Sequence, residues 1–247
     1  MKTMKFHSSL FLAFIFLLTA CQVEISGPTP IAAFSPSPLP PTPISPPPSP
    51  TATFAPSARY FLENFNAEVK GWSTIITSGE PGLLDLSAKD GNWVFDLGGK
   101  NLHVLALYDL EAYKNVRIDF SVKSLGEDAY SLNILCRYTK NNGWYQYEIF
   151  NTGLYNLYYV TWDQNAQPNP VLLAEGGTDA IHAGPASNQF TVICKDRALD
   201  LYINDQLVRS YTDNQYVLLQ GQIGIGVFSF ERAPVRLAFD WLKVSLP

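Results

Sequence analysis

The stretch Asn115-Val-Arg-Ile-Asp-Phe-Ser-Val-Lys123 decides the fold class, because apolar and polar residues alternate along it without a fault. Its apolar members are Val116, Ile118, Phe120 and Val122, and its polar members are Arg117, Asp119, Ser121 and Lys123. Successive side chains of a β-strand point to opposite faces. The pattern therefore predicts a strand with one face in a core and the other in water.

Outward from this stretch, the same period of two recurs between turn signals such as Asp90-Gly-Asn and Asn141-Asn-Gly. Short strands without long helices favour antiparallel pairing, because parallel strands need crossover connections that are usually helical. No repeat of fixed period appears, which argues against a propeller. We therefore expect an all-β fold, an antiparallel two-sheet jelly-roll sandwich over residues 59–247. The further predicted strands are 82–88, 93–97, 103–108, 130–138, 144–150, 154–162, 190–195, 199–204, 207–211, 222–228 and 235–244.

Composition excludes one class of partner. The chain has 247 residues, with 17 Lys plus Arg against 22 Asp plus Glu, and a net charge of −5. Binding to phosphate backbones requires clustered positive charge, so no nucleic-acid partner is expected. We expect the domain to be a monomer.

The N-terminus has the sequence features of an export signal. Lys2 and Lys5 precede an uncharged apolar run, and the run ends in Leu18-Thr-Ala-Cys21. This pattern is typical of a signal peptide, here residues 1–20, and its end resembles the lipobox of bacterial lipoproteins, in which the cysteine is acylated. We predict lipidation at Cys21, which would anchor the protein to a membrane on the extracytoplasmic side of the cell envelope. An ordinary secretory signal is the alternative.

Residues 21–58 have the composition of a tether. Between Gly27 and Ser57 there is no charged residue, and the segment is rich in Pro, Ser, Thr and Ala. Such a segment cannot bury a core and favours extended polyproline II, so it would hold the domain away from the membrane. A proline-rich ligand for a recognition module is the alternative interpretation.

Two cysteines are expected to pair. Cys136 shares a strand face with Leu132 and Ile134, and Cys194 shares one with Phe190 and Val192. Both should point into the core, and an exported protein meets an oxidising compartment, so we predict a disulfide between them. Two reduced buried thiols are the alternative.

Four segments carry a resemblance: Tyr60-Phe-Leu-Glu-Asn-Phe with Gly71-Trp72, Cys136-Arg-Tyr with Trp144-Tyr-Gln-Tyr-Glu-Ile149, Cys194 to Asn204, and Gly221-Gln-Ile-Gly-Ile-Gly-Val with Phe239-Asp-Trp-Leu-Lys-Val244. Over residues 60–246 the chain resembles the concanavalin A-like lectin/glucanase superfamily, within it the LamG-like and 3-keto-disaccharide hydrolase-like domains. The resemblance implies the sandwich fold. It leaves the activity open, because that superfamily includes lectins, glycosidases and adhesion modules.

Catalytic patterns are not found. A glycosidase of this fold would be expected to carry a Glu-x-Asp-x-x-Glu run, and the carboxylates here are isolated. Glu148 is the best placed of them for a catalytic role, whereas Asp240 is interpreted as part of a β-bulge, because Leu242 and Val244 break the period set by Phe239. No Gly-x-Ser-x-Gly elbow is present, and His103 and His182 stand in unrelated contexts.

No cofactor and no metal site built on His or Cys is expected. Calcium could be held at Asp90-Gly-Asn92 or Asp163-Gln-Asn165, although both are also ordinary turn sequences.

The outward faces of three predicted strands offer groups that could bind a sugar. If these strands are neighbours in the concave sheet, they form one polar and aromatic platform of the kind that carbohydrate recognition needs. Solvated strand faces are the alternative interpretation. We hypothesise a non-catalytic module that binds a glycan or another extracellular polymer. A glycoside hydrolase using Glu148, or a structural or protein-binding envelope domain, are the alternatives. The predicted platform residues are Asn133, Arg137, Trp144, Gln146, Glu148, Tyr202 and Asn204, with Asp200 beside them.

Overall fold

The computed structural model describes residues 59–126 and 129–247. The signal peptide over residues 1–20, the tether over residues 21–58 and the lipidation at Cys21 lie outside the described residues. Within the described ranges, no helix combines the length and the apolar character needed to cross a membrane.

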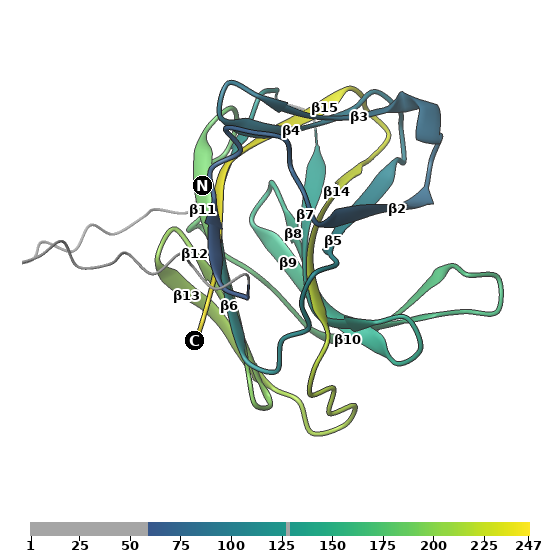
Figure 1. Cartoon of the computed structure of the whole chain (residues 1–247), viewed down its shortest axis with the longest axis vertical. Coiled ribbons are helices and arrows are strands. Elements are labelled where there is room, and N and C mark those ends of the chain that lie inside the picture. Colours follow the sequence, from purple (N-terminus) through teal and green to yellow (C-terminus); the bar gives the residue numbers. More distant parts are fainter. Residues whose placement is uncertain (1–58, 127–128) are drawn as a thin grey trace, which may run out of the picture. The chain divides into compact units, whose positions relative to one another are not determined.

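Two antiparallel sheets pack face to face (Figure 1). Sheet A has the order β13-β12-β11-β6-β15-β4-β3, with β1 added to β15. Its strands are β1 (Phe61–Glu63), β3 (Leu84–Lys89), β4 (Asn92–Leu97), β6 (Val116–Ser124), β11 (Ser187–Lys195), β12 (Ala198–Ile203), β13 (Gln206–Thr212) and β15 (Val235–Ser245). Sheet B has the order β10-β9-β8-β7-β14-β5-β2. Its strands are β2 (Trp72–Ser78), β5 (His103–Tyr108), β7 (Tyr130–Thr139), β8 (Gly143–Phe150), β9 (Leu154–Trp162), β10 (Pro168–Gly177) and β14 (Gln222–Ser229). The expected two-sheet jelly-roll sandwich is confirmed.

The core lies between the sheets, and β6 shows how the sequence pattern builds it. Val116, Ile118, Phe120 and Val122 are all buried in the main apolar cluster, as the alternation predicts. The opposite face of β6 is less wet than expected, since Asp119 and Ser121 are each only 8% exposed. Thr191 on the neighbouring β11 bonds the Asp119 carboxylate, and Trp241 on β15 lies opposite Ser121. Neighbouring strands therefore cover part of the face that faces outward.

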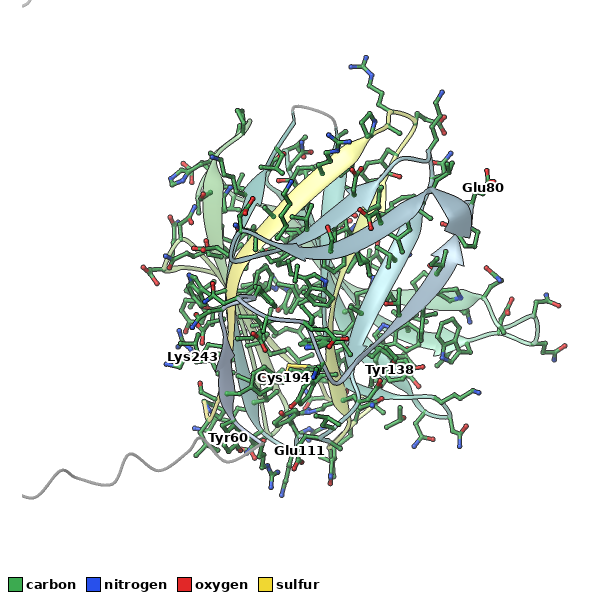
Figure 2. The ribbon with its side chains drawn as sticks, turned by 45° about the horizontal axis from the view of Figure 1, so that its top comes forward. Tyr60, Glu80, Glu111, Tyr138, Cys194 and Lys243 are labelled. Atoms are coloured by element: carbon green, nitrogen blue, oxygen red, sulfur yellow. A yellow bond between two sulfur atoms is a disulfide. The ribbon has the colours of Figure 1, made fainter. Side chains whose placement is uncertain are left out.

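The predicted disulfide is confirmed. Cys136 on β7 and Cys194 on β11 are joined, with their Cα atoms 6.7 Å apart. Because β7 belongs to sheet B and β11 to sheet A, the bond ties the two layers together through the core. Figure 2 shows the sulfur bond of Cys194 in the interior of the sandwich.

Strand boundaries depart from expectation where the alternation is weak. The expected strand over residues 82–88 begins only at Leu84, because a 3-10 turn over Pro81–Leu83 precedes it. Strands β1, β2 and β10 were not expected, since Trp72–Ser78 does not alternate and Pro168–Gly177 contains two prolines. The prolines are accommodated because β10 is an edge strand of sheet B, where a missing backbone donor costs no ladder bond.

The bulge expected at Asp240 is present. The pairing of β15 with β6 shifts register between Phe239 and Trp241. The extra residue returns Leu242 and Val244 to the core and leaves Trp241 facing outward.

Candidate functional site

The face of sheet B turned away from sheet A carries a cavity of about 320 Å³. Its walls come from the two edge strands, β2 and β10, and from four of the strands between them, so this face is concave. In Figure 1 β2 and the hairpin formed by β9 and β10 both extend to the right of the central strands, on either side of this face. The lining residues are Thr77, Ser78, His103, Leu105, Trp144, Gln146, Glu148, Tyr158, Val160, Gln167, Pro168, Pro170 and Phe228.

The period of two places these groups on the concave face. On β8, Gln146 and Glu148 alternate with Tyr145 and Tyr147, which are buried in the core between the sheets. The floor is also shaped by Gly226 of β14, which is paired with Leu105 on one side and Asn133 on the other. A Cβ at Gly226 would meet Leu105 Cδ2 at 2.6 Å, so the glycine leaves room for the Leu105 side chain.

Glu148 is half-buried in the wall of the cavity and faces Asn133 across the β7–β8 ladder. Ser131 Oγ donates to Glu148 Oε1 at 2.9 Å. Burial raises the pKa of the Glu148 carboxyl, and hydrogen bonds from Ser131 and Asn156 partly oppose that rise. Protonation of Glu148 is therefore easier than for a carboxyl in water.

His103 lies on the β2 side of the cavity. Its Nδ1 is 2.7 Å from Thr77 Oγ1, and its ring packs on Phe228 with centroids 5.4 Å apart. Burial lowers the pKa of the imidazole to about 4, so the ring is neutral at physiological pH. Its Nε2 atom is buried and has no hydrogen-bond partner among the described residues.

Trp144 does not offer a stacking surface, contrary to the expected platform. Its side chain is 0% exposed, in a second apolar cluster on the concave face, and its ring packs against Tyr138 and Trp162 at centroid distances of 5.2 and 5.0 Å. The indole Nε1 donates to Gln146 Oε1 at 2.9 Å, and Gln146 Nε2 donates to Asn133 Oδ1 at 2.7 Å. These three residues form a buried chain beneath the cavity, because Tyr138 of β7 and Trp162 of β9, on the two strands that flank β8, cover Trp144.

Arg137 lies away from the cavity. It has a positive φ of 57°, which breaks the alternation at the end of β7, and its side chain is 2% exposed. The guanidinium donates to the carbonyls of Leu218 and Lys114 at 2.7 and 3.3 Å and lies 6.0 Å from the ring centroid of Tyr145. It holds loops at one end of the sandwich.

The expectation that three platform strands are neighbours in one sheet is wrong. β7 and β8 pair in sheet B, whereas β12, which carries Asp200 and Tyr202, belongs to sheet A, and Asn204 follows that strand. Asn204 Nδ2 donates to Ala180 O and Asn188 Oδ1, so its side chain orders a loop. Of the predicted residues, the structure brings together Asn133, Trp144, Gln146 and Glu148.

Carboxylates do not form a close pair in the cavity, since Glu148 is the single acid in its lining. Glu175 on β10 shares the concave face, because both residues are register partners of Asn156 on β9. Two strand spacings separate Glu148 from Glu175, about 9.5 Å between Cα atoms. Asp119, Asp200 and Asp240 all lie on sheet A.

The two turns that could hold calcium, at Asp90-Gly-Asn92 and Asp163-Gln-Asn165, use their side chains in local hydrogen bonds. Asp163 Oδ1 accepts bonds from the backbone N–H groups of Asn165 and Gln167, and Asn92 Nδ2 donates to the Asp90 carbonyl. These groups order their own turns. In the described ranges no three His, Cys, Asp or Glu side chains gather as a metal site would require.

The sequence pattern did not single out His103, Thr77, Tyr158 and Phe228 as site residues. A strand over 103–108 places His103 on the same face as Leu105, which is a usable signal. Only the order of the strands shows that this face is the one that also carries Glu148.

A comparison against protein family models finds no match, and neither does a comparison against curated proteins. Among solved structures, the chain is similar to a protein of unknown function with a galectin-like fold from Bacillus subtilis (TM-score 0.57, 11% identity, covering 75% of this chain and 94% of that chain). It is also similar to a glycoside hydrolase family 16 endo-glucanase from Bacteroides ovatus (0.55, 10%, 75% and 99%) and to a Bacillus licheniformis β-glucanase (0.52, 14%, 76% and 98%). The described residues therefore form a jelly roll of the galectin-like, concanavalin A-like kind.

Proposed function

We propose that this protein binds an uncharged glycan in the concave cavity of sheet B. The observation that carries the proposal is the cavity itself, whose lining combines the half-buried rings of Tyr158 and Phe228 with hydroxyl, amide and imidazole groups. The similar fold of two glucanases supports a saccharide as the ligand class.

The chemistry of the walls suits a sugar. Tyr158 and Phe228 supply ring faces against which the C–H patches of a pyranose can pack. Gln167 supplies an amide that both donates and accepts, as sugar hydroxyls do, and the hydroxyls of Thr77 and Ser78, which bond His103 Nδ1 and Asn101 O, add further oxygen lone pairs.

The charged residues of the cavity lining favour a neutral ligand. The lining contains no Lys or Arg, and its one ionisable acid is Glu148. An anionic sugar would meet the half-buried Glu148 carboxylate with no Lys or Arg in the lining to offset the repulsion. A neutral glycan is therefore favoured over a uronic acid polymer.

We further propose that the domain is displayed from a membrane in the cell envelope, through acylation of Cys21 and the proline-rich segment up to residue 58. The sequence pattern around Leu18-Thr-Ala-Cys21 supports this part of the proposal. The glycan would then lie outside the cytoplasm.

Affinity electrophoresis of the purified full chain tests binding in the concave cavity. The gels contain mixed-linkage β-glucan, laminarin, xylan or galactomannan. We expect retardation in at least one gel, and we expect Tyr158→Ala to weaken it at least tenfold. Tyr216→Ala is the matched control, since Tyr216 is also half-buried but lies outside the cavity. No retardation in any gel, or equal retardation of the Tyr158 variant, would overturn the proposal.

One observation favours hydrolysis as a second candidate function. The pKa of Glu148 is raised, as a general acid requires, and Glu175 lies two strands away on the same face. Side chains that rise in parallel from Cα atoms about 9.5 Å apart would suit an inverting glycosidase, whose carboxyl groups stand about 6.5–9.5 Å apart, better than a retaining one at about 5 Å. Release of reducing ends from the same polysaccharides, abolished in Glu148→Gln, would establish this activity.

A further inference from the structure

The outer face of sheet A carries a tryptophan that the fold has turned outward. Phe239 points into the core, so an uninterrupted strand would also send Trp241 into the core. The bulge at Asp240 moves the ladder by one residue and places Trp241, half-buried, opposite Ser121 on β6. Bulges are frequent beside functional sites, where they re-aim a side chain.

A second cavity, of about 350 Å³, lies beside this indole. The groups that matter in its lining are Arg117, Asp119, Gln189, Thr191, Trp241 and Lys243. They come from three neighbouring strands, β15, β6 and β11. Lys243, Asp119 and Thr191 form one row across the strands, and Trp241, Ser121 and Gln189 form the next.

Hydrogen bonds within the protein hold the polar side chains of this cavity in place. Arg117 donates from both Nε and Nη2 to the Asp119 carboxylate at 2.6–2.9 Å, and Thr191 Oγ1 donates to Asp119 Oδ1 at 2.6 Å. Asp119 is only 8% exposed, although it lies on an outward strand face. Asp119 therefore holds the Arg117 guanidinium and the Thr191 hydroxyl in fixed positions at the edge of the cavity.

The charges in this cavity balance. The paired Arg117 and Asp119 leave one cation, Lys243, and one anion, Asp205, in the lining. No strong field of either sign is available to select an ionic ligand. The remaining features are a flat indole, which matches the C–H face of a sugar, and the Gln189 amide, which can both donate to and accept from sugar hydroxyls.

We propose that the cavity beside Trp241 is a second saccharide-binding site, which takes an uncharged sugar stacked on the Trp241 indole. It lies on sheet A, whereas the concave cavity lies on sheet B, and the core that the disulfide crosses separates the two. In Figure 2 Cys194 lies between Lys243 of the outer face of sheet A and Tyr138 of sheet B. A domain with two such faces could hold two glycan chains at once. The site stands on its own residues and does not depend on the concave cavity.

The tryptophan side chains give a direct test. All five tryptophans of the chain lie among the described residues, so the purified full chain should show five indole N–H signals by ¹H–¹⁵N NMR. Trp241→Phe assigns one of them to Trp241. The probes are cellotetraose, laminaritetraose, mannotetraose and xylotetraose, each titrated separately. We expect at least one of them to shift the Trp241 signal in a saturable way.

Variants separate the two faces. Trp241→Ala and Gln189→Ala should each weaken binding at this site at least tenfold. For Gln189→Ala the affinity is measured from the shift of the Trp241 signal. For Trp241→Ala it is measured by calorimetry in a Tyr158→Ala background, in which the concave cavity no longer binds. Tyr158→Ala alone should leave the Trp241 shift intact, and thermal melts show that each variant is folded. A Trp241 signal that none of the four sugars moves, or one that Tyr158→Ala abolishes, would overturn the second site. If no sugar moves the Trp241 signal but one moves other indole signals, the proposed glycan binding in the concave cavity still stands.

Discussion

Trp144 and Gln146 lie two residues apart on β8 and are joined by a hydrogen bond from the indole Nε1 to the amide Oε1 at 2.9 Å. The bond satisfies the indole donor inside an apolar cluster, where an unpaired N–H would be costly. It also turns the Gln146 amide nitrogen toward Asn133. The relationship makes Trp144 part of the floor that supports the cavity.

Trp144→Ala should destabilise the domain by about 3–5 kcal/mol, because it leaves a large void between Tyr138 and Trp162. The thermal midpoint should fall by about 10 °C, as measured by circular dichroism. Trp162→Ala, at a half-buried position, is the control and should cost less. An unchanged midpoint in Trp144→Ala would contradict its supporting role.

Glu148→Gln should raise the stability of the domain at neutral pH. Burial raises the pKa of the folded-state carboxyl, so this group's contribution to stability is fully present below its unfolded value and is lost as the pH rises through the folded value. Glutamine keeps the acceptor for Ser131 and carries no charge. Urea denaturation of both proteins at pH 7 and pH 3 measures the effect, and the two curves should converge at the acid end. A less stable variant at pH 7 would show that the charged form is favoured by folding.

His103 should titrate near pH 4 in the folded domain, because burial lowers its imidazole pKa from 6.5 to about 4. The unfolded chain takes up this proton at higher pH, so His103 contributes stability above pH 6.5 that is lost as the pH falls toward 4. A ¹H–¹⁵N titration of the imidazole checks the value directly. His103→Gln should lose less stability than the wild type between pH 6.5 and pH 4, and a steeper loss would refute the assignment.

Cys136→Ser should lower the free energy of unfolding by about 4 kcal/mol, since the bond closes a loop across a sequence separation of 58 residues. The midpoint should drop by about 10 °C. Cys194→Ser should give the same loss, and the double variant should be no worse than either single one. Additive losses would show that the two cysteines act separately.

Cys21→Ser should release the protein from the membrane fraction. The wild type should incorporate an alkyne analogue of palmitate during growth and remain with the membranes after salt extraction, because acyl chains and not charge would hold it. The variant should do neither. A wild type that takes up no label and stays soluble would show that Leu18-Thr-Ala-Cys21 is an ordinary cleavage region.

Which residues form strands could be predicted from the sequence wherever one strand face is buried and the other is wet. Alternation over 115–123 located β6 and its core face, and a break in that alternation located the bulge at Asp240. The inward parity of Cys136 and Cys194 predicted the bond between them. These are local properties, because the period of a strand is set by its own backbone.

Strand neighbours were decided only by the tertiary structure. Tyr202 has the same outward parity as Glu148, yet β12 pairs in sheet A and β8 in sheet B. Pairing between distant strands depends on how all the apolar faces fit together, which a local pattern does not encode.

The sequence by itself determined that this chain carries an antiparallel sandwich in which Cys136 and Cys194 pair in the core, since the period of two assigns most strand side chains to an inward or an outward face. Only the tertiary structure decided which of the outward faces are open. Rings from the flanking strands bury Trp144 under Tyr138 and Trp162, a positive φ withdraws Arg137, and a bulge turns Trp241 outward. Solvent exposure depends on sheet curvature and neighbouring strands, and a period of two contains neither.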